Sequence, residues 1–248
     1  MRVLITGAGS GIGKGLALAL ATEGHTILVT DLRQQAADDV AREIQASGGE
    51  ARALALDVSD HGSIEALNGE PVDVLINNAG LQHVAPLEDF PPEKFDQLIQ
   101  VMLTGAAMLT RALLSGMRQQ GFGRIINVGS IHALVASPYK SAYVAAKHGL
   151  LGFSKVVALE TADTDITINT VCPSYVLTPL VEQQIAAQAR ANGISEQDVI
   201  DEIMLKPMPK GAFISIEELA GVCQFLISPA ARNMTGQTIT LDGGWTAR

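Results

Sequence analysis

The stretch LITGAGSGIGKGLALAL, residues 4–20, decides the fold of this chain. It begins as an apolar strand, continues through Gly7, Gly11 and Gly13 in the spacing T-G-x-x-x-G-x-G, and ends as an apolar helix. Glycines at a strand-to-helix turn let the backbone bend tightly and approach a pyrophosphate, which then lies on the positive N-terminus of the helix. The stretch therefore predicts a dinucleotide-binding turn at the start of an α/β fold, in preference to a merely flexible glycine turn.

Short apolar runs alternate with helix-length segments along the rest of the chain. The expected strands are 2–6, 26–31, 51–58, 72–78, 124–130, 166–173 and 238–244. The expected helices are 12–24, 35–47, 92–120, 141–162 and 217–228, with one or two helical turns within 60–70. Strands that are apolar throughout are covered on both faces. Their alternation with helices predicts a Rossmann-type, doubly wound parallel sheet of about seven strands.

The segment 174–212 interrupts this alternation. It is polar, has a helical pattern at 180–205, and contains Pro179, Pro207 and Pro209. A long excursion between two strands of such a sheet is usually a lid over the substrate. We therefore expect residues 1–248 to form a single catalytic domain with a lid at about 174–212.

Composition and charge exclude several classes of protein. The formal net charge of −9 leaves no basic stripe for a nucleic acid. Cys172 and Cys223 stand in apolar surroundings, which favours buried thiols over a disulfide framework. The opening MRVLITG lacks a cleavage site, and no apolar run reaches the ~20 residues of a membrane span. We expect a compact cytoplasmic protein without nucleic-acid or membrane partners.

No cluster of His, Cys, Asp or Glu shows the spacing of metal ligands, so no metal site is expected. Hydride chemistry needs none, because the cofactor carries it. Among the histidines, we expect structural roles for His83 and His148 and surface positions for His25 and His61.

Asp31 ends the second expected strand, 18 residues after Gly13. A carboxylate there accepts hydrogen bonds from the adenosine ribose hydroxyls and repels a 2′-phosphate, which predicts NAD over NADP. Ser10 and Leu32 occupy places where a cation would favour NADP, although Arg33 is close enough to tolerate it. Two residues at the end of the third strand are expected to flank the adenine: Asp57, which could instead cap the next helical turn, and Val58.

Four features occur in order along the chain. They are TGAGSGIG (6–13), NNAG (77–80), Ser130, and the pair Tyr143 and Lys147 within SPYKSAYVAAKHG (137–149). The tyrosine–lysine spacing alone is a weak signal, but chance does not supply all four in this order. Together they resemble the short-chain dehydrogenase/reductase family over essentially the whole chain. The resemblance implies an NAD-dependent oxidoreductase and a homotetramer, assembled through the helices at 92–120 and 141–162.

The chemistry that the resemblance implies explains the spacing of Tyr143 and Lys147. Residues four apart share one face of a helix. The lysine charge would lower the pKa of the phenol from about 10 toward neutrality. Tyr143 can then act as general base toward an alcohol or general acid toward a ketone, and Ser130 can polarise the carbonyl oxygen.

The same resemblance, added to the glycine turn, implies a full set of cofactor contacts. Tyr143 and Lys147 would approach the nicotinamide ribose. The remaining expected contacts are Gly7, Ser10, Gly11, Ile12, Gly13, Asn78, Ala79, Gly80, Pro173, Val176 and Thr178.

Met102, in FDQLIQVMLTGA (95–106), departs from the family pattern, which places a fourth catalytic residue, an asparagine, at this position. A thioether cannot supply the amide hydrogen bonds that hold a relay water beside the lysine, and Thr104 is expected to point to another face. Either the relay runs through water and backbone alone, or turnover is reduced. Ser174 is a smaller departure, since the family often has glycine there.

Three polar residues, Gln82, His132 and Lys140, are expected at the carboxyl edge of the sheet. An amide, an imidazole and an ammonium converging there suit a small carboxylate, although each could also be a solvated loop residue. The stretches around them resemble the D-3-hydroxybutyrate dehydrogenases, a branch of the family acting on (R)-3-hydroxybutyrate and acetoacetate. Three further residues are expected around the substrate: Gln184 on the lid, with Gln183 as its rival, and Tyr175 and Trp245 as apolar walls.

Two other functions stay open at this point. A reductase of 3-oxoacyl thioesters would need room for a pantetheine arm, and an acidic carrier protein would be repelled by a net charge of −9 unless a local basic patch received it. A redox sensor that binds NAD(H) without turnover is favoured only by Met102. Ser130, Tyr143 and Lys147 argue against a sensor, because a sensor needs no proton donor.

Overall fold

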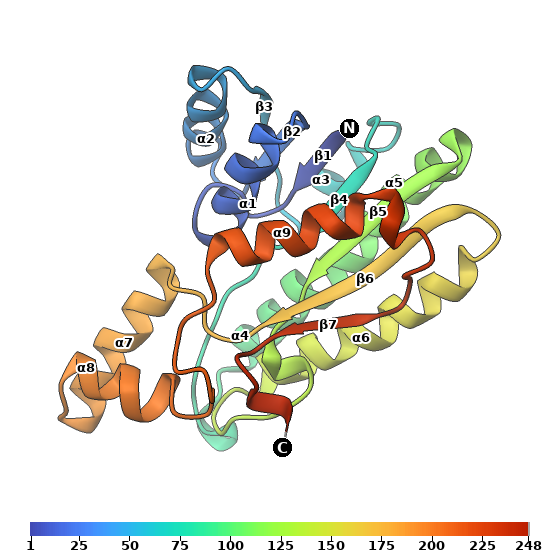
Figure 1. The fold of residues 1–248 in the computed structure, drawn as a ribbon. Helices are drawn as coiled ribbons and strands as arrows, with labels where there is room; N and C mark the ends of the chain where they lie inside the picture. Colours follow the sequence, from blue (N-terminus) through green and yellow to red (C-terminus); the bar gives the residue numbers. More distant parts are fainter. Residues whose placement is uncertain (248) are drawn as a thin grey trace.

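Seven parallel strands form one sheet in the order β3-β2-β1-β4-β5-β6-β7 in the computed structural model, which describes residues 1–247 (Figure 1). The strands are β1 (Arg2–Ile5), β2 (Thr26–Asp31), β3 (Glu50–Ala55), β4 (Val74–Asn77), β5 (Phe122–Val128), β6 (Asp165–Pro173) and β7 (Thr238–Leu241). The order reverses at β1, where Val3 pairs with Ile27 on one side and Val74 on the other. Such a reversal opens a crevice at the carboxyl ends of the strands.

Helices cover both faces of the sheet, which confirms the predicted doubly wound α/β fold (Figure 1). They are α1 (Gly11–Thr22), α2 (Gln34–Ala46), α3 (His61–Glu65), α4 (Pro92–Ile99), α5 (Ala106–Gln120), α6 (Ser141–Glu160), α7 (Pro179–Asn192), α8 (Glu196–Asp198) and α9 (Ile216–Ile227). Ile5 packs with α1, α2 and α9 in one apolar core, and Leu4 packs with α3, α5 and α6 in a second. Alternate side chains of β1 thus pack into the cores on opposite faces of the sheet.

All seven expected strands and all expected helices occur, but several strands end sooner than the apolar runs do. β2 has the expected bounds, whereas β3 ends at Ala55, β5 at Val128 and β7 at Leu241. A strand ends where its pairing ends, and Ala55 is the last residue of β3 paired with β2. As a result Asp57, Val58 and Ser130 lie in loops just beyond the sheet.

The expected helix at 92–120 is one continuous helical segment whose hydrogen-bond pattern changes to a π-turn, η2 (Gln100–Gly105), between α4 and α5. A Cβ on Gly105 would lie 2.4 Å from the Val58 carbonyl oxygen, so the segment passes very close to the β3–α3 loop. Pro92–Gln120 is also long and apolar enough to cross a membrane by length and composition, a test that core helices of soluble proteins pass too. Here it packs on the sheet and on α6.

The expected helical pattern at 180–205 is broken into α7, α8 and a π-turn, η4 (Val199–Met204). Gly193, with φ +65°, ends α7, and Ser195 starts α8 in a reciprocal capping box with Asp198. Ile185, Ala189, Val199 and Met204 form a small apolar core of their own. Figure 1 shows this segment projecting from the body of the domain at the carboxyl side of the sheet.

The expectation that His25 lies at the surface is wrong, since only 7% of this residue is exposed. Its Nε2 lies 3.0 Å from the Gln224 side-chain oxygen of α9, a partner 199 residues away in the chain. His61 is exposed and both cysteine thiols are buried and free, as expected.

Candidate active site

The glycine turn between β1 and α1 has the backbone that its sequence predicts. Gly7 and Gly11 have φ of +63° and +55°, in the left-handed region that favours glycine. A Cβ on Gly13 would lie 2.4 Å from the Gly7 carbonyl oxygen, so a side chain there would push the turn apart. Ser10 is the N-cap of α1, but its side chain makes no capping hydrogen bond. The first N–H groups of α1 therefore remain available to an anion.

A cavity of about 330 Å³ extends from this turn to α6. Its lining includes predicted cofactor residues Gly7, Ser10, Gly11, Ile12, Asp31, Asn78, Gly80, Tyr143, Lys147 and Thr178. Glycine backbone at one end, a carboxylate at the edge and a lysine at the other end suit a dinucleotide's phosphates and riboses. The residues present therefore fit a nicotinamide cofactor.

Six predicted cofactor residues lie outside that lining. They are Gly13, Asp57, Val58, Ala79, Pro173 and Val176. Gly13 sits beneath the turn, and Pro173 and Val176 line a second, neighbouring pocket that is described below. The Asp57 carboxylate instead accepts hydrogen bonds from the Ser59 N–H at 2.8 Å and the Ser59 hydroxyl at 2.6 Å. Asp60, and not Asp57, caps α3.

Asp31 holds its carboxylate at the edge of the cofactor cavity. Its Oδ2 accepts a hydrogen bond from the Gly9 N–H at 3.1 Å, and its Oδ1 accepts one from the Arg33 N–H at 3.0 Å. A Cβ on Gly9 would lie 2.7 Å from that Oδ2, so only glycine permits this approach. The Arg33 guanidinium, mostly exposed, stays 3.9 Å from the carboxylate.

Ser130, Tyr143 and Lys147 come together where β5 ends beside α6. The Lys147 side chain is buried, donates a 2.6 Å hydrogen bond from Nζ to the Val128 carbonyl, and lies 5.8 Å from the Tyr143 ring centroid. Burial lowers the pKa of Lys147 to about 8. Burial also raises the pKa of Tyr143 above its usual 10, while hydrogen bonding to Ser130 opposes that rise. Both shifts have burial as their largest cause, and the expected lowering of the Tyr143 pKa toward neutrality is not found.

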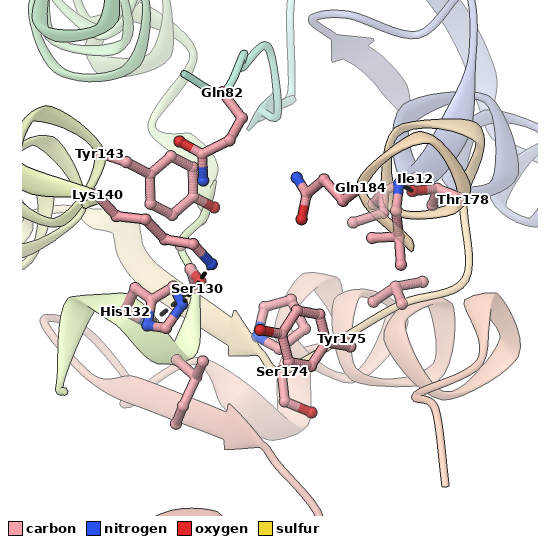
Figure 2. Close-up of a pocket in the computed structure, with 15 residues that line it drawn as sticks. Ile12, Gln82, Ser130, His132, Lys140, Tyr143, Ser174, Tyr175, Thr178 and Gln184 are labelled. Carbon is pink, nitrogen blue, oxygen red and sulfur yellow. Dashed lines mark hydrogen bonds between the residues drawn. The ribbon is translucent and has the colours of Figure 1, made fainter. Parts of the chain in front are cut away.

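A second cavity, of about 120 Å³, adjoins the first and shares Ile12, Gly129, Tyr143 and Thr178 with it (Figure 2). It brings together predicted substrate residues Gln82, Ser130, His132, Lys140, Tyr143, Tyr175 and Gln184. Gln82 accepts a hydrogen bond from the His83 N–H through Oε1 at 3.1 Å. Its Nε2 therefore faces the pocket as a donor, as Figure 2 shows.

Comparison with known protein families identifies the family of this chain. The family model described as short chain dehydrogenase matches residues 1–189. The chain belongs to the short-chain dehydrogenase family. It is 46% identical over 253 residues to the D-beta-hydroxybutyrate dehydrogenase of Cupriavidus necator, spanning 99% of this chain and 97% of that one. The D-beta-hydroxybutyrate dehydrogenase of Rhizobium meliloti is 42% identical over 255 residues, spanning 99% and 98%.

Among solved structures, an actinorhodin polyketide ketoreductase with NADPH matches this short-chain dehydrogenase with a TM-score of 0.94. The two chains are 32% identical, and the match covers 100% of this chain and 97% of the other. The family resemblance seen in the sequence is thereby confirmed. The protein is an oxidoreductase that uses a nicotinamide cofactor.

Lys140 supplies the positive charge of the smaller pocket in this short-chain dehydrogenase. Its Nζ lies 3.2 Å from His132 Nε2 and 5.8 Å from the centre of the Tyr175 ring. Burial, with the Lys140 charge second, lowers the pKa of His132 to about 4, so the imidazole is neutral at pH 7 and accepts from the ammonium. The described lining residues include no Asp or Glu. The pocket is therefore electrostatically suited to an anion.

Gln184, on α7, faces the pocket, while its rival Gln183 is exposed. Trp245 stands behind the lining and not in it. Its ring stacks on Tyr175 at a centroid distance of 6.2 Å and meets the His132 ring edge-on at 6.0 Å. The tryptophan thus fixes two pocket walls from outside.

Met102 is 2% exposed and packs against Phe90 and Leu98. It lines the cofactor cavity and also a small cavity of about 10 Å³ beside Lys147. Thr6 and Asn77 are polar residues in the lining of that small cavity, and Val58 and Ala79 line it too. Its volume matches one water molecule.

The structure adds lining residues that sequence reasoning did not assign to a site. They are Leu81, Val128, Gly129, Ile131, Ser174, Pro179 and Val181. Most are chain neighbours of assigned residues, and Val181 precedes Gln184 by one helical turn, so helical spacing is a signal that would have found it. Within residues 1–247, no group of three or more His, Cys, Asp or Glu is arranged to hold a metal ion.

Proposed function

We propose that this short-chain dehydrogenase interconverts (R)-3-hydroxybutyrate and acetoacetate with NAD. The main support is that Lys140 and Gln82 line the same pocket as Ser130 and Tyr143. The described lining of that pocket contains no acidic side chain. A short 3-hydroxy acid has its carboxylate and its reacting oxygen at the two ends of such a pocket. The names of the two hydroxybutyrate dehydrogenase relatives support the same substrate.

The chain's residues divide the work as follows. A nicotinamide cofactor, when bound, takes up or supplies the hydride. Ser130 donates a hydrogen bond to the substrate oxygen, and Tyr143 takes the hydroxyl proton as the carbonyl forms, or returns it in the reverse direction. The Lys147 ammonium stabilises the phenolate that this proton transfer needs. Lys140, Gln82 and, as the lid closes, Gln184 bind the carboxylate.

The direct test is to follow NADH absorbance with purified protein, NAD and (R)-3-hydroxybutyrate. In parallel assays the (S) acid or a 3-hydroxyacyl thioester replaces the (R) acid, and NADP replaces NAD. We expect turnover with the (R) acid and NAD. Turnover of the thioester alone would replace the proposal with a thioester reductase, and bound NADH without any turnover would favour a sensor.

Asp31→Ala is expected to lower the ratio of kcat/KM for NAD to that for NADP by about 10- to 100-fold. The variant loses charged hydrogen bonds to the ribose, of about 1.5–3 kcal/mol, and the repulsion of a 2′-phosphate. Steady-state kinetics with both cofactors measures the ratio. Asp57→Ala is the matched control, because its carboxylate is turned toward Ser59, and its ratio should stay at the wild-type value.

Met102→Asn tests whether a relay amide is missing from this enzyme. We expect kcat to change by less than about threefold, since Thr6 and Asn77 already offer polar groups to a one-water cavity beside Lys147. Burying an amide among Phe90 and Leu98 should cost about 1–3 kcal/mol of stability. Kinetics and thermal unfolding measure the two effects. A tenfold rise in kcat would show that the thioether slows the natural enzyme.

The proposal extends to assembly and location. We propose a cytoplasmic homotetramer, joined through the outer faces of α5 and α6, with 174–212 acting as a substrate lid. Val156 and Leu159 leave apolar surface exposed on α6, which supports a partner subunit there. Light scattering on the purified protein gives the mass that tests it.

A further inference from the structure

Tyr139 has a backbone conformation that a bulky residue rarely adopts. Its φ is +68°, and within residues 1–247 it is the one non-glycine residue with a positive φ. The preceding residue is Pro138, and a proline followed by a left-handed residue is the order of a type II turn. The left-handed position of such a turn normally holds glycine or asparagine, so a tyrosine there is strained.

The side chain of Tyr139 does not explain why this conformation is kept. The residue is 59% exposed, and no described contact holds its ring. The backbone of Tyr139, in contrast, makes a hydrogen bond to another loop. The Tyr139 carbonyl accepts a hydrogen bond from the Ala85 N–H at 3.0 Å.

That hydrogen bond joins the two loops that carry the pocket's anion-binding side chains. Ala85 follows Gln82 by three residues and packs against the apolar cluster that contains Phe90 and Ala142. Lys140 is the residue directly after Tyr139, and its Nζ meets His132 at 3.2 Å. One peptide group, between Tyr139 and Lys140, thus connects the Gln82 loop to the Lys140 side chain.

We propose that the left-handed backbone of Tyr139 positions Lys140 against Gln82 for carboxylate binding, which makes Tyr139 a positioning residue. This inference rests on the proposed function, since it assigns Lys140 to a substrate carboxylate. If φ of Tyr139 returned to negative values, the following peptide would rotate. Its carbonyl would leave Ala85, and Lys140 would leave His132. The strain is therefore local and tied to substrate binding, as expected where it is kept for function.

The test uses two variants that both remove the exposed ring but differ in backbone preference. Asparagine tolerates the left-handed region, and valine, being β-branched, is excluded from it. Tyr139→Asn is expected to keep kcat/KM for acetoacetate within about twofold of wild type and to unfold at an equal or higher temperature. Tyr139→Val is expected to lose about tenfold, through KM and not kcat, because one charge-assisted contact is displaced.

Methyl acetoacetate separates positioning from general damage, because it has the same ketone and no carboxylate. Both variants should reduce the ester at the wild-type rate. In a Lys140→Met background the difference between Asn and Val at position 139 should disappear, since the group being positioned is gone.

Three outcomes would overturn the inference. Equal kinetics for the Asn and Val variants would show that the backbone conformation does not matter. Equal losses on acid and ester in the Val variant would show loop damage alone. A persisting difference in the Lys140→Met background would show that another group is positioned. Failure of the proposed function looks different, because wild type itself would then not prefer acetoacetate to its ester.

Discussion

Tyr143→Phe is expected to lower kcat about 10³-fold while leaving the dissociation constant for NADH within about twofold of wild type. We propose the phenol as the group that exchanges a proton with the substrate oxygen, because Tyr143 lines both cavities, and Phe keeps the ring that lies edge-on to His132. The variant keeps the glycine turn and Asp31, which line the same cofactor cavity. Steady-state kinetics and a fluorescence titration with NADH measure the two quantities.

Tyr139→Phe is the matched control, because it removes a phenol from an exposed position four residues before Tyr143 and keeps an aromatic residue in the same backbone conformation. Its kinetics should equal those of wild type. Activity of Tyr143→Phe above about a tenth of wild type would assign the proton transfer to another group, and His132 would be the next residue to change.

The sequence predicted the fold well where local pattern and tertiary pairing agree. The bounds of β2 match because its apolar run and its pairing with β3 both cover Thr26–Asp31. The β3 run continues to Val58, but its partner β2 has already ended, so Asp57 and Val58 lie in a loop. Apolar composition alone cannot reveal where a neighbouring strand stops.

Other misses have long-range causes. His25 follows a glycine turn, where polar residues are usually exposed, and its burial depends on Gln224 of α9. The π-turn η2 lies where Gly105 passes the Val58 carbonyl, a contact that no local pattern encodes. The break between α7 and α8, in contrast, has local sequence signals that the expected pattern at 180–205 did not use. Gly193 and the capping pair of Ser195 and Asp198 are typical of helix ends.

The sequence predicted individual candidate site residues where the proposed chemistry allows few residue types. A proton donor, a cation beside it and donors for a carboxylate allow few residue types, and Tyr143, Lys147 and Lys140 line the expected cavities. Residues that contribute only shape or backbone, such as Gly129 and Val181, had no chemical signal of their own. Trp245 shows the intermediate case, since its ring supports the pocket wall from behind Tyr175.

Lys147→Met is expected to give the second large effect, a loss of about 10²-fold or more in kcat together with a gain in stability. Without the ammonium, only the hydrogen bonding to Ser130 opposes the burial that raises the pKa of Tyr143, so the phenolate becomes scarcer at neutral pH. The rise of activity with pH in alcohol oxidation should accordingly move to higher pH in the variant. A pH profile of kcat/KM measures that displacement.

The gain in stability follows from the same buried charge. The pKa of Lys147 falls from 10.5 to about 8 on folding, which corresponds to about 3 kcal/mol of destabilisation while the amine is charged. Losing the hydrogen bond to the Val128 carbonyl costs about 1 kcal/mol in return. The variant should therefore be about 2 kcal/mol more stable at pH 7, or about 4–8 °C in Tm.

The pH dependence of that gain identifies its cause. Below pH 8 the amine is charged in both the folded and unfolded states, so the full burial cost is present. As pH rises from 8 toward 10.5 the folded protein holds a neutral amine, and the advantage of the variant should fade. Lys94→Met, at an exposed position on α4 outside the proposed subunit interface, should change neither kcat nor Tm. A variant less stable than wild type at pH 7 would mean that the fold already compensates the charge, and the stability cost assigned to this buried lysine would then not exist.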